Sequence, residues 1–222
     1  MAFLTLDASA IKSVEKEGGS SYVTTSGIYD LTLKHAIVAG TNGGATGINY
    51  LFNNCNSYGN YILGKDGKSL FSRDVLLSLT AILGLTELAD PEATQVQFKS
   101  KTEEHPCLPD LEGIEVKAWI SFEYSTYNGE IKEKVSVKRF YNAATGATGS
   151  ETLAGEGFGV TLEKDKAYAD TVKYKDGLDA EQVKAWKASN NPNSAPKGNA
   201  AAAAGFGGTP VVTPFPTGPQ ND

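Results

Sequence analysis

Hydrophobic and polar residues alternate over residues 114–141 more regularly than anywhere else in the chain. In the first half of this stretch apolar residues occupy every second position, which is typical of a β-strand with one buried face. The same period returns after Asn128-Gly129, a pair that favours the two positive φ angles of a type I′ turn. The pattern predicts a long β-hairpin in which Tyr127 pairs with Glu130.

This turn also predicts the register of the two arms. On the apolar face Phe122 then opposes Val135, and Ile120 opposes Val137. The other face alternates lysines with aromatic rings, a combination that binds single-stranded nucleic acid by stacking bases among positive charges. The same residue types are also common on the solvated face of a sheet, so a purely structural role stays open. The predicted pairs on this face are Glu123 with Lys134, Trp119 with Lys138, and Lys117 with Phe140.

Shorter patterns predict that the rest of the core is mainly β with one amphipathic helix. In the first strand Leu31, Leu33 and Ile37 are expected on one face. The helix carries an apolar stripe and ends at Gly84, a natural C-terminal stop. The expected elements are strands over 27–39, 47–54, 58–63 and 91–101, a helix over 73–84, loops over 103–109 and 142–159, and short helices over 165–175 and 179–189.

Composition indicates that this core is flanked by N- and C-terminal segments with little regular secondary structure. The chain has 222 residues, of which 40% are hydrophobic, and many of its 24 glycines and 9 prolines fall in the last quarter. The last stretch has few large apolar residues, which is typical of a disordered segment. The predicted organisation is an N-terminal arm over 1–21, a core over 22–160, short helices over 161–189 and a disordered tail over 190–222 that carries a possible docking motif at Pro214, Phe215 and Pro216.

Charge and cysteine content narrow the class of protein. A net charge of -6 argues against binding nucleic acid through overall charge, although a local basic face is compatible with it. The presence of only Cys55 and Cys107 argues against a disulfide framework. With no secretory signal and no apolar run of about 20 residues, we expect a cytoplasmic protein.

Candidate catalytic and metal-binding chemistry is weak. His105 and Cys107 share a loop, but their spacing matches no common zinc pattern. The Gly- and Lys-rich letters of residues 64–69 do not have the spacing of a phosphate-binding P-loop, and no nucleophile or zinc-protease motif occurs. The sequence therefore predicts a binding protein without catalytic residues, metal or cofactor.

Five segments together resemble phage-encoded single-stranded DNA-binding proteins of the OB-fold kind. They read GIYDLTLKHA, GINYLF, LLSLTAILG, LPDLEGIEVKAWISFEY and KRFYNAATG, and the resemblance covers about residues 22–150. It implies a mainly β, OB-fold-like small antiparallel barrel with peripheral helices, whose open face binds single strands. In such proteins a C-terminal tail commonly recruits replication partners and guards the groove, but it is usually acidic, whereas here Asp222 is its only acid.

The hairpin and the resemblance together predict sequence-nonspecific binding of single-stranded DNA in phage replication or recombination, in the cytoplasm of an infected bacterium. The partners left open are a second copy of the chain and replication or recombination proteins at the tail. The main alternative is a virion structural or assembly protein, and a third is a recombination accessory factor that loads another protein. The predicted DNA-binding residues are Lys34, Tyr58, Tyr61, Lys65, Lys68, Lys117, Trp119, Lys132, Lys134, Lys138, Arg139 and Phe140, with His35 as an extension.

Overall fold

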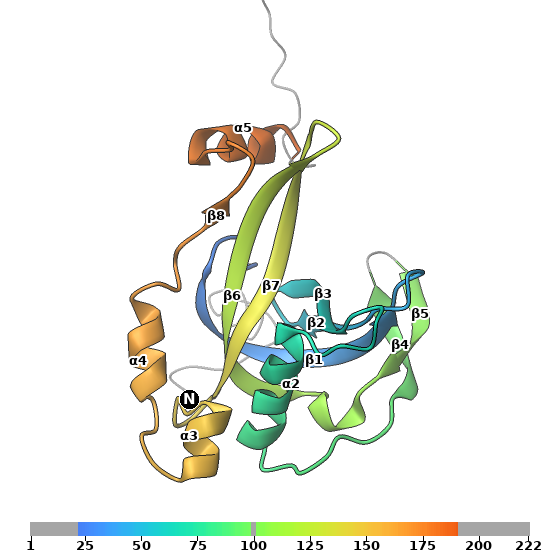
Figure 1. Cartoon of the computed structure of the whole chain (residues 1–222), viewed down its shortest axis with the longest axis vertical. Helices are drawn as coiled ribbons and strands as arrows, with labels where there is room; N and C mark the ends of the chain where they lie inside the picture. Colours follow the sequence, from blue (N-terminus) through green and yellow to red (C-terminus); the bar gives the residue numbers. More distant parts are fainter. Residues whose placement is uncertain (1–21, 99–100, 191–222) are drawn as a thin grey trace, which may run out of the picture.

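The computed structural model describes residues 22–98 and 101–190, which form one eight-stranded sheet with helices packed against it (Figure 1). The predicted arm, most of the predicted tail and the motif at residues 214–216 lie outside the described residues. All strand pairs run antiparallel except the short β8, which is parallel to β6. The strands are β1 (Gly27–Gly40), β2 (Thr46–Phe52), β3 (Asn56–Leu63), β4 (Glu92–Phe98), β5 (Lys101–Cys107), β6 (Ile114–Tyr127), β7 (Glu130–Asn142) and β8 (Lys173–Tyr174).

Strand β1 lies at the centre of the sheet because it pairs with three other strands along its two edges. One edge pairs with β2, which continues to β3. The other edge is shared: β6 pairs with its first half, where Leu31 lies opposite Val116, and β5 meets its second half, where Ile37 lies opposite Cys107. The mainly β, antiparallel architecture expected from the sequence is confirmed, but the ladder of strand pairs does not close into a ring.

The gap in the ladder lies between β3 and β7, and two buried side chains of β3 bridge it. The Asn60 Oδ1 atom accepts a hydrogen bond from the Val137 N–H at 3.2 Å, and the Asn60 amide donates to the Ile48 carbonyl at 3.1 Å. The Ser57 hydroxyl donates to the Val135 carbonyl at 3.0 Å. The bonds to Val137 and Val135 satisfy backbone groups on the free edge of β7, so they hold the hairpin against β3.

Removing this bridge is expected to destabilise the protein. In Asn60→Ala the buried Val137 N–H loses its acceptor, which costs about 1–3 kcal/mol in the free energy of unfolding. Urea denaturation of the variant would measure the loss. Asn53→Ala is a suitable control, since the Asn53 side chain accepts its bond from Thr32 N–H at an exposed position where water replaces it. An equal loss in both variants would contradict a structural role for the bridge.

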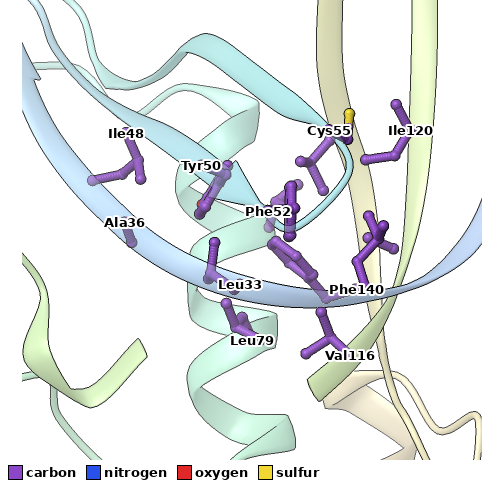
Figure 2. Close-up of a cluster of buried hydrophobic side chains, with 14 of the residues drawn as sticks. Leu33, Ala36, Ile48, Tyr50, Phe52, Cys55, Leu79, Val116, Ile120 and Phe140 are labelled. Carbon is purple, nitrogen blue, oxygen red and sulfur yellow. The ribbon is translucent and has the colours of Figure 1, made fainter. Parts of the chain in front are cut away.

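The main hydrophobic core lies inside the curve of the sheet, against helix α2 (Phe71–Ile82). Figure 2 shows Leu79 of this helix beside Leu33. Phe140 is fully buried beside them, with its ring centroid 5.3 Å from that of Tyr50 in an edge-to-face arrangement. The predicted apolar stripe of the helix is confirmed by its buried residues, which are Val75, Leu76, Leu79, Thr80 and Ile82.

A second, smaller cluster lies on the opposite face of the sheet, under the β4–β5 hairpin. It contains Ile37, Leu51, Val96 and Cys107. The expectation that Ile37 shares a face with Leu33 is wrong, because a β-bulge after Leu33 reverses the alternation along β1. The expected loop over 103–109 is also wrong: most of this segment belongs to β5, which pairs with β4, a pairing that the sequence pattern does not reveal.

The long hairpin has the predicted turn and the predicted register in its outer half. Asn128 and Gly129 have φ angles of 52° and 77°, and Glu123 lies opposite Lys134 as expected. The register changes between Trp119 and Ile120, where a bulge adds one residue to β7. The predicted pairs of Trp119 with Lys138 and of Lys117 with Phe140 are therefore wrong. The observed pairs are Trp119 with Arg139, Ala118 with Phe140, and Lys117 with Tyr141.

The C-terminal part of the described chain wraps along the hairpin as short helices joined by β8. The expected helix over 165–175 is wrong, since α4 ends at Lys166 and β8 follows it, and the expected loop over 142–159 contains α3. Helix α5 is confirmed together with its N-cap Asp179, which forms a capping box with Gln182. No helix among the described residues is both long and apolar enough to cross a membrane. The helices are α3 (Gly149–Ala154), α4 (Val160–Lys166) and α5 (Ala180–Ser189).

Glu151 holds the α3–α4 connection together. Its carboxylate accepts hydrogen bonds from the N–H groups of Thr148 at 2.9 Å and Thr161 at 2.8 Å, and a longer one from Gly159 at 3.4 Å. Burial by itself raises the pKa of this carboxyl, but the N–H donors outweigh it and lower the pKa to about 2. The charged form is therefore the one that stabilises the fold.

This pKa predicts how stability depends on pH. The contribution of Glu151 is fully present above its ordinary pKa of 4.5 and is lost as the pH falls from there toward about 2. Glu151→Gln leaves buried N–H donors without a full set of acceptors, which is expected to cost about 1–3 kcal/mol at neutral pH. Urea denaturation at pH 7 and at pH 3 would test this. A variant with the same loss at both pH values would contradict the assignment.

Candidate nucleic-acid interface

Three neighbouring hollows meet at Tyr58 on β3 and form one concave surface. The largest, about 700 Å³, lies between the hairpin, the start of β3 and α5, and Trp186 and Phe122 line it. A second, about 500 Å³, runs along β3 past Tyr61, and a third, about 470 Å³, lies on the other side of Tyr58 next to Lys34. Since all three share the Tyr58 side chain, we treat them as one site and call it the tyrosine groove.

The groove presents three partly exposed tyrosine rings. Tyr22, Tyr58 and Tyr61 have exposed fractions of 58%, 40% and 41%. Tyr58 and Tyr61 are three residues apart, so regular alternation would put them on opposite faces of β3. Gly59 between them has a φ of +66° and lies where the β2–β3 register shifts, which places both rings toward solvent. The same shift orients the side chains of Ser57 and Asn60 toward β7, where they form the bridge described above.

Lysines border the groove on both sides. Lys34 of β1 lines the third hollow, and Lys134 of β7 lines the first two. Both are exposed, and neither forms an ion pair with a described residue. Lys187 of α5 is held differently: its ammonium lies 3.3 Å from the Glu133 carboxylate and 5.4 Å from the centroid of the Phe122 ring. Lys34 and Lys134 are therefore the groove cations that remain available to a ligand.

The hydroxyls of Tyr22 and Tyr58 remain neutral at physiological pH. Burial raises the pKa of the Tyr22 and Tyr58 hydroxyls above its usual value, and the neighbouring Cys55 thiol raises both further. Cys55 is itself buried at the floor of the largest hollow, and burial followed by the charge of Glu133 raises its pKa to about 12. Neutral phenol rings beside ammonium groups suit a ligand that combines flat apolar rings with negative charge.

The structure separates the predicted site residues into two groups on different surfaces. Lys34, Tyr58, Tyr61 and Lys134 come together in the groove, although they belong to three different strands. Beyond the groove, Lys65 and Lys68 lie on the turn that follows β3, where Lys68 is 3.0 Å from the Asp66 carboxylate. The others belong to the outer face of the β6–β7 hairpin or to the core; they are Lys117, Trp119, Lys132, Lys138, Arg139 and Phe140.

Several of these hairpin residues are engaged within the fold. The Lys117 ammonium donates to Asp30 and to the Ala143 carbonyl, each at 2.6 Å. Arg139 pairs with Asp165 of α4, and Lys132 pairs with Glu130 near the turn. The predicted stacking role of Phe140 does not fit the structure, because the bulge turns this ring into the core, where it is fully buried.

Two of the predicted DNA-binding residues remain candidates on the outer face of the hairpin. The groove also contains residues that were not among the predicted DNA-binding residues. Trp119 and Lys138 are half-buried on the outer face next to the bulge. The added groove residues are Tyr22 and Trp186, which sequence patterns place in separate segments far from the hairpin. Trp186 reaches the groove because α5 folds back onto β6, with the Trp186 ring 6.3 Å from that of Tyr124. The one sequence signal for this contact is the apolar pair Val183 and Trp186, which lie three residues apart on the expected helix over 179–189.

Comparison with known proteins does not assign the chain to a family: no protein-family model matches the sequence, and no curated protein matches it either.

Proposed function

We propose that the protein binds single-stranded DNA without sequence preference, through the tyrosine groove. The observation that carries the proposal is the placement of three partly exposed tyrosine rings between Lys34 and Lys134, neither of which forms an ion pair with a described residue. Bases of any sequence stack on aromatic rings, and ammonium groups neutralise the phosphates between them. Duplex DNA keeps its bases stacked on one another, so its rings are not available to the groove.

The order of elements supports an OB-fold-like barrel as the scaffold. Three consecutive strands are followed by a helix, and a later hairpin pairs with the first strand and returns to face the third. The OB-fold is a small, partly open five-stranded barrel that binds oligonucleotides on one face and its loops. In this interpretation β1, β2, β3, β6 and β7 form the barrel, and the β4–β5 hairpin is an addition between the helix and β6.

The net charge of -6 is compatible with this activity because the binding surface is local. Together with the resemblance of the sequence to phage-encoded single-strand binding proteins, the groove leads us to infer a role in phage DNA replication or recombination. Partner proteins would then meet the protein on single-stranded intermediates.

A titration of fluorescently labelled oligothymidine with the full chain tests the proposal. We expect anisotropy to rise at low salt, to fall steeply as salt increases because phosphate contacts release counterions, and to remain low for the matching duplex. The oligonucleotide would be about 30 nucleotides long, roughly twice the largest footprint of one OB-fold. Absence of binding at low salt, or equal binding of the duplex, would refute it.

One observation favours the alternative of an assembly protein. Apolar side chains are exposed on α2 and around α3, two helices that contact each other. Phe71 and Leu77 have exposed fractions of 63% and 50%, and Leu153 and Phe158 have 79% and 52%. Large apolar side chains exposed on two adjoining helices favour contact with another protein. Light scattering would separate the two functions, since an assembly protein forms large ordered particles and ignores oligonucleotides.

A further inference from the structure

Four lysines gather around one carboxylate on the outer face of the hairpin. Lys134 of β7 is the cross-strand partner of Glu123 on one side, and Lys173 of β8 is its partner on the other. Paired residues of neighbouring strands project to the same face of a sheet, so the three side chains lie together. The Lys175 ammonium donates to the same carboxylate at 2.8 Å. Lys138, at the bulge of β7, completes what we call the lysine patch.

Positive charge in this patch exceeds what the fold neutralises. Glu123 is the acid that interacts with it, and Asp176, next in sequence to Lys175, instead accepts a hydrogen bond from the Thr126 N–H at 2.9 Å. Burial lowers the pKa of Lys138, and the charges of Lys173, Lys134 and Lys175 lower it further, while among the described residues Glu123 acts in the opposite sense. In a chain of net charge -6, such an excess of cations is a binding surface for an anion.

The patch and the tyrosine groove meet at one residue. Lys134 lines two of the three hollows of the groove, and it also interacts electrostatically with Glu123 and Lys138 on the outer face. Strand β7 is joined to β3 by side chains alone, so its edge forms the rim between the two surfaces. A flexible polyanion that leaves the groove beside Lys134 therefore reaches the patch by crossing this single strand.

We propose that the lysine patch is a second phosphate-binding surface, which holds the backbone of a single DNA strand after it leaves the tyrosine groove across Lys134. This inference rests on the proposed function and extends it from a groove to a path around the edge of the hairpin. Of the described rings nearest the patch, Trp119 is half-buried and Tyr174 stacks on Tyr124, so the patch contributes affinity through phosphates while the groove stacks the bases. Longer strands then bind more tightly and with a steeper salt dependence than strands that fill the groove alone.

The test compares the unaltered chain with the triple variant Lys138→Gln, Lys173→Gln and Lys175→Gln, which keeps Lys134. Anisotropy titrations over a series of salt concentrations would use oligothymidines of about 30 and about 6 nucleotides, the short one near the lower limit of an OB-fold footprint. For the long strand we expect the salt slope to fall by about 2, because each single-strand phosphate contact contributes about 0.7, and affinity to fall at least tenfold at low salt. For the short strand we expect little change.

A control with the same change of net charge is the triple variant Lys101→Gln, Lys164→Gln and Lys184→Gln, whose lysines are exposed on β5, α4 and α5. It is expected to keep the slope of the unaltered chain, and thermal unfolding would show that both variants are folded. An unchanged salt slope in the patch variant, or equal losses of affinity in the two variants, would refute phosphate binding at the lysine patch. Either result would leave the proposal of groove binding intact. If the unaltered chain binds no single strand, the proposed function fails and the path fails with it.

Discussion

Replacing Tyr58 and Tyr61 together by alanine is expected to weaken binding of oligothymidine by about 2–6 kcal/mol, since each stacked base contributes about 1–3 kcal/mol. This corresponds to a loss of affinity of roughly 30-fold or more. Both rings project from β3 into the groove and are not part of the hydrophobic core, so the variant should fold. Anisotropy titration at one fixed salt concentration would measure the change.

The matched control is the double variant Tyr127→Ala and Tyr168→Ala. These rings are more exposed than the groove tyrosines, at 66% and 67%, but lie at the hairpin turn and after α4, outside the three hollows. We expect this control to bind like the unaltered chain. If the two double variants lose affinity to the same extent, stacking occurs on any exposed tyrosine and the groove has no special role.

The second large effect is on stability. Phe140→Ala is expected to lower the free energy of unfolding by about 3–5 kcal/mol, the usual cost of removing a fully buried aromatic ring. Trp119→Ala, at the neighbouring half-buried position on the other face, is expected to cost much less and to leave the protein folded. Chemical denaturation of both variants would measure the difference.

The contrast between these two residues tests the register of the hairpin. If the strands paired without a bulge, Phe140 would lie on the outer face beside Lys117, and its replacement would be nearly neutral for stability. A small loss for Phe140→Ala together with a large loss for Trp119→Ala would therefore contradict the observed pairing.

The regular part of the fold could be predicted from the sequence because alternation and turn chemistry are local. The hairpin turn at Asn128-Gly129, the strands of the central sheet and the stripe of α2 follow from patterns of a few residues. The errors in which face a side chain occupies occur at β-bulges, after Leu33 in β1 and beside Trp119 in the hairpin. One extra residue reverses every later side chain, and nothing in a binary pattern marks where it is inserted.

The candidate site was only partly predictable because it depends on contacts between distant segments. Tyr58 and Lys34 can be proposed as binding residues from the sequence. That they lie in the same groove depends on the pairing of β1, β2 and β3. Lys173 belongs to β8, a two-residue strand that is too short to show alternation, and Lys175 follows directly after it. The docking of this segment on β6 brings both lysines to Glu123. Tyr22 lies next to the groove only because the chain before β1 runs beside Asn54.

The most direct test of the tyrosine groove is photo-crosslinking of the full chain to oligothymidine that contains 5-iododeoxyuridine, followed by mass spectrometry of the adducts. Binding in the groove predicts adducts at Tyr58 and Tyr61. Unlabelled single-stranded competitor should reduce these adducts, and duplex competitor should not. Tyr168 and Phe71 are more exposed than either, so unspecific reaction would favour them. Adducts confined to such residues outside the groove, or a pattern unchanged by the competitor, would contradict single-strand binding at this site.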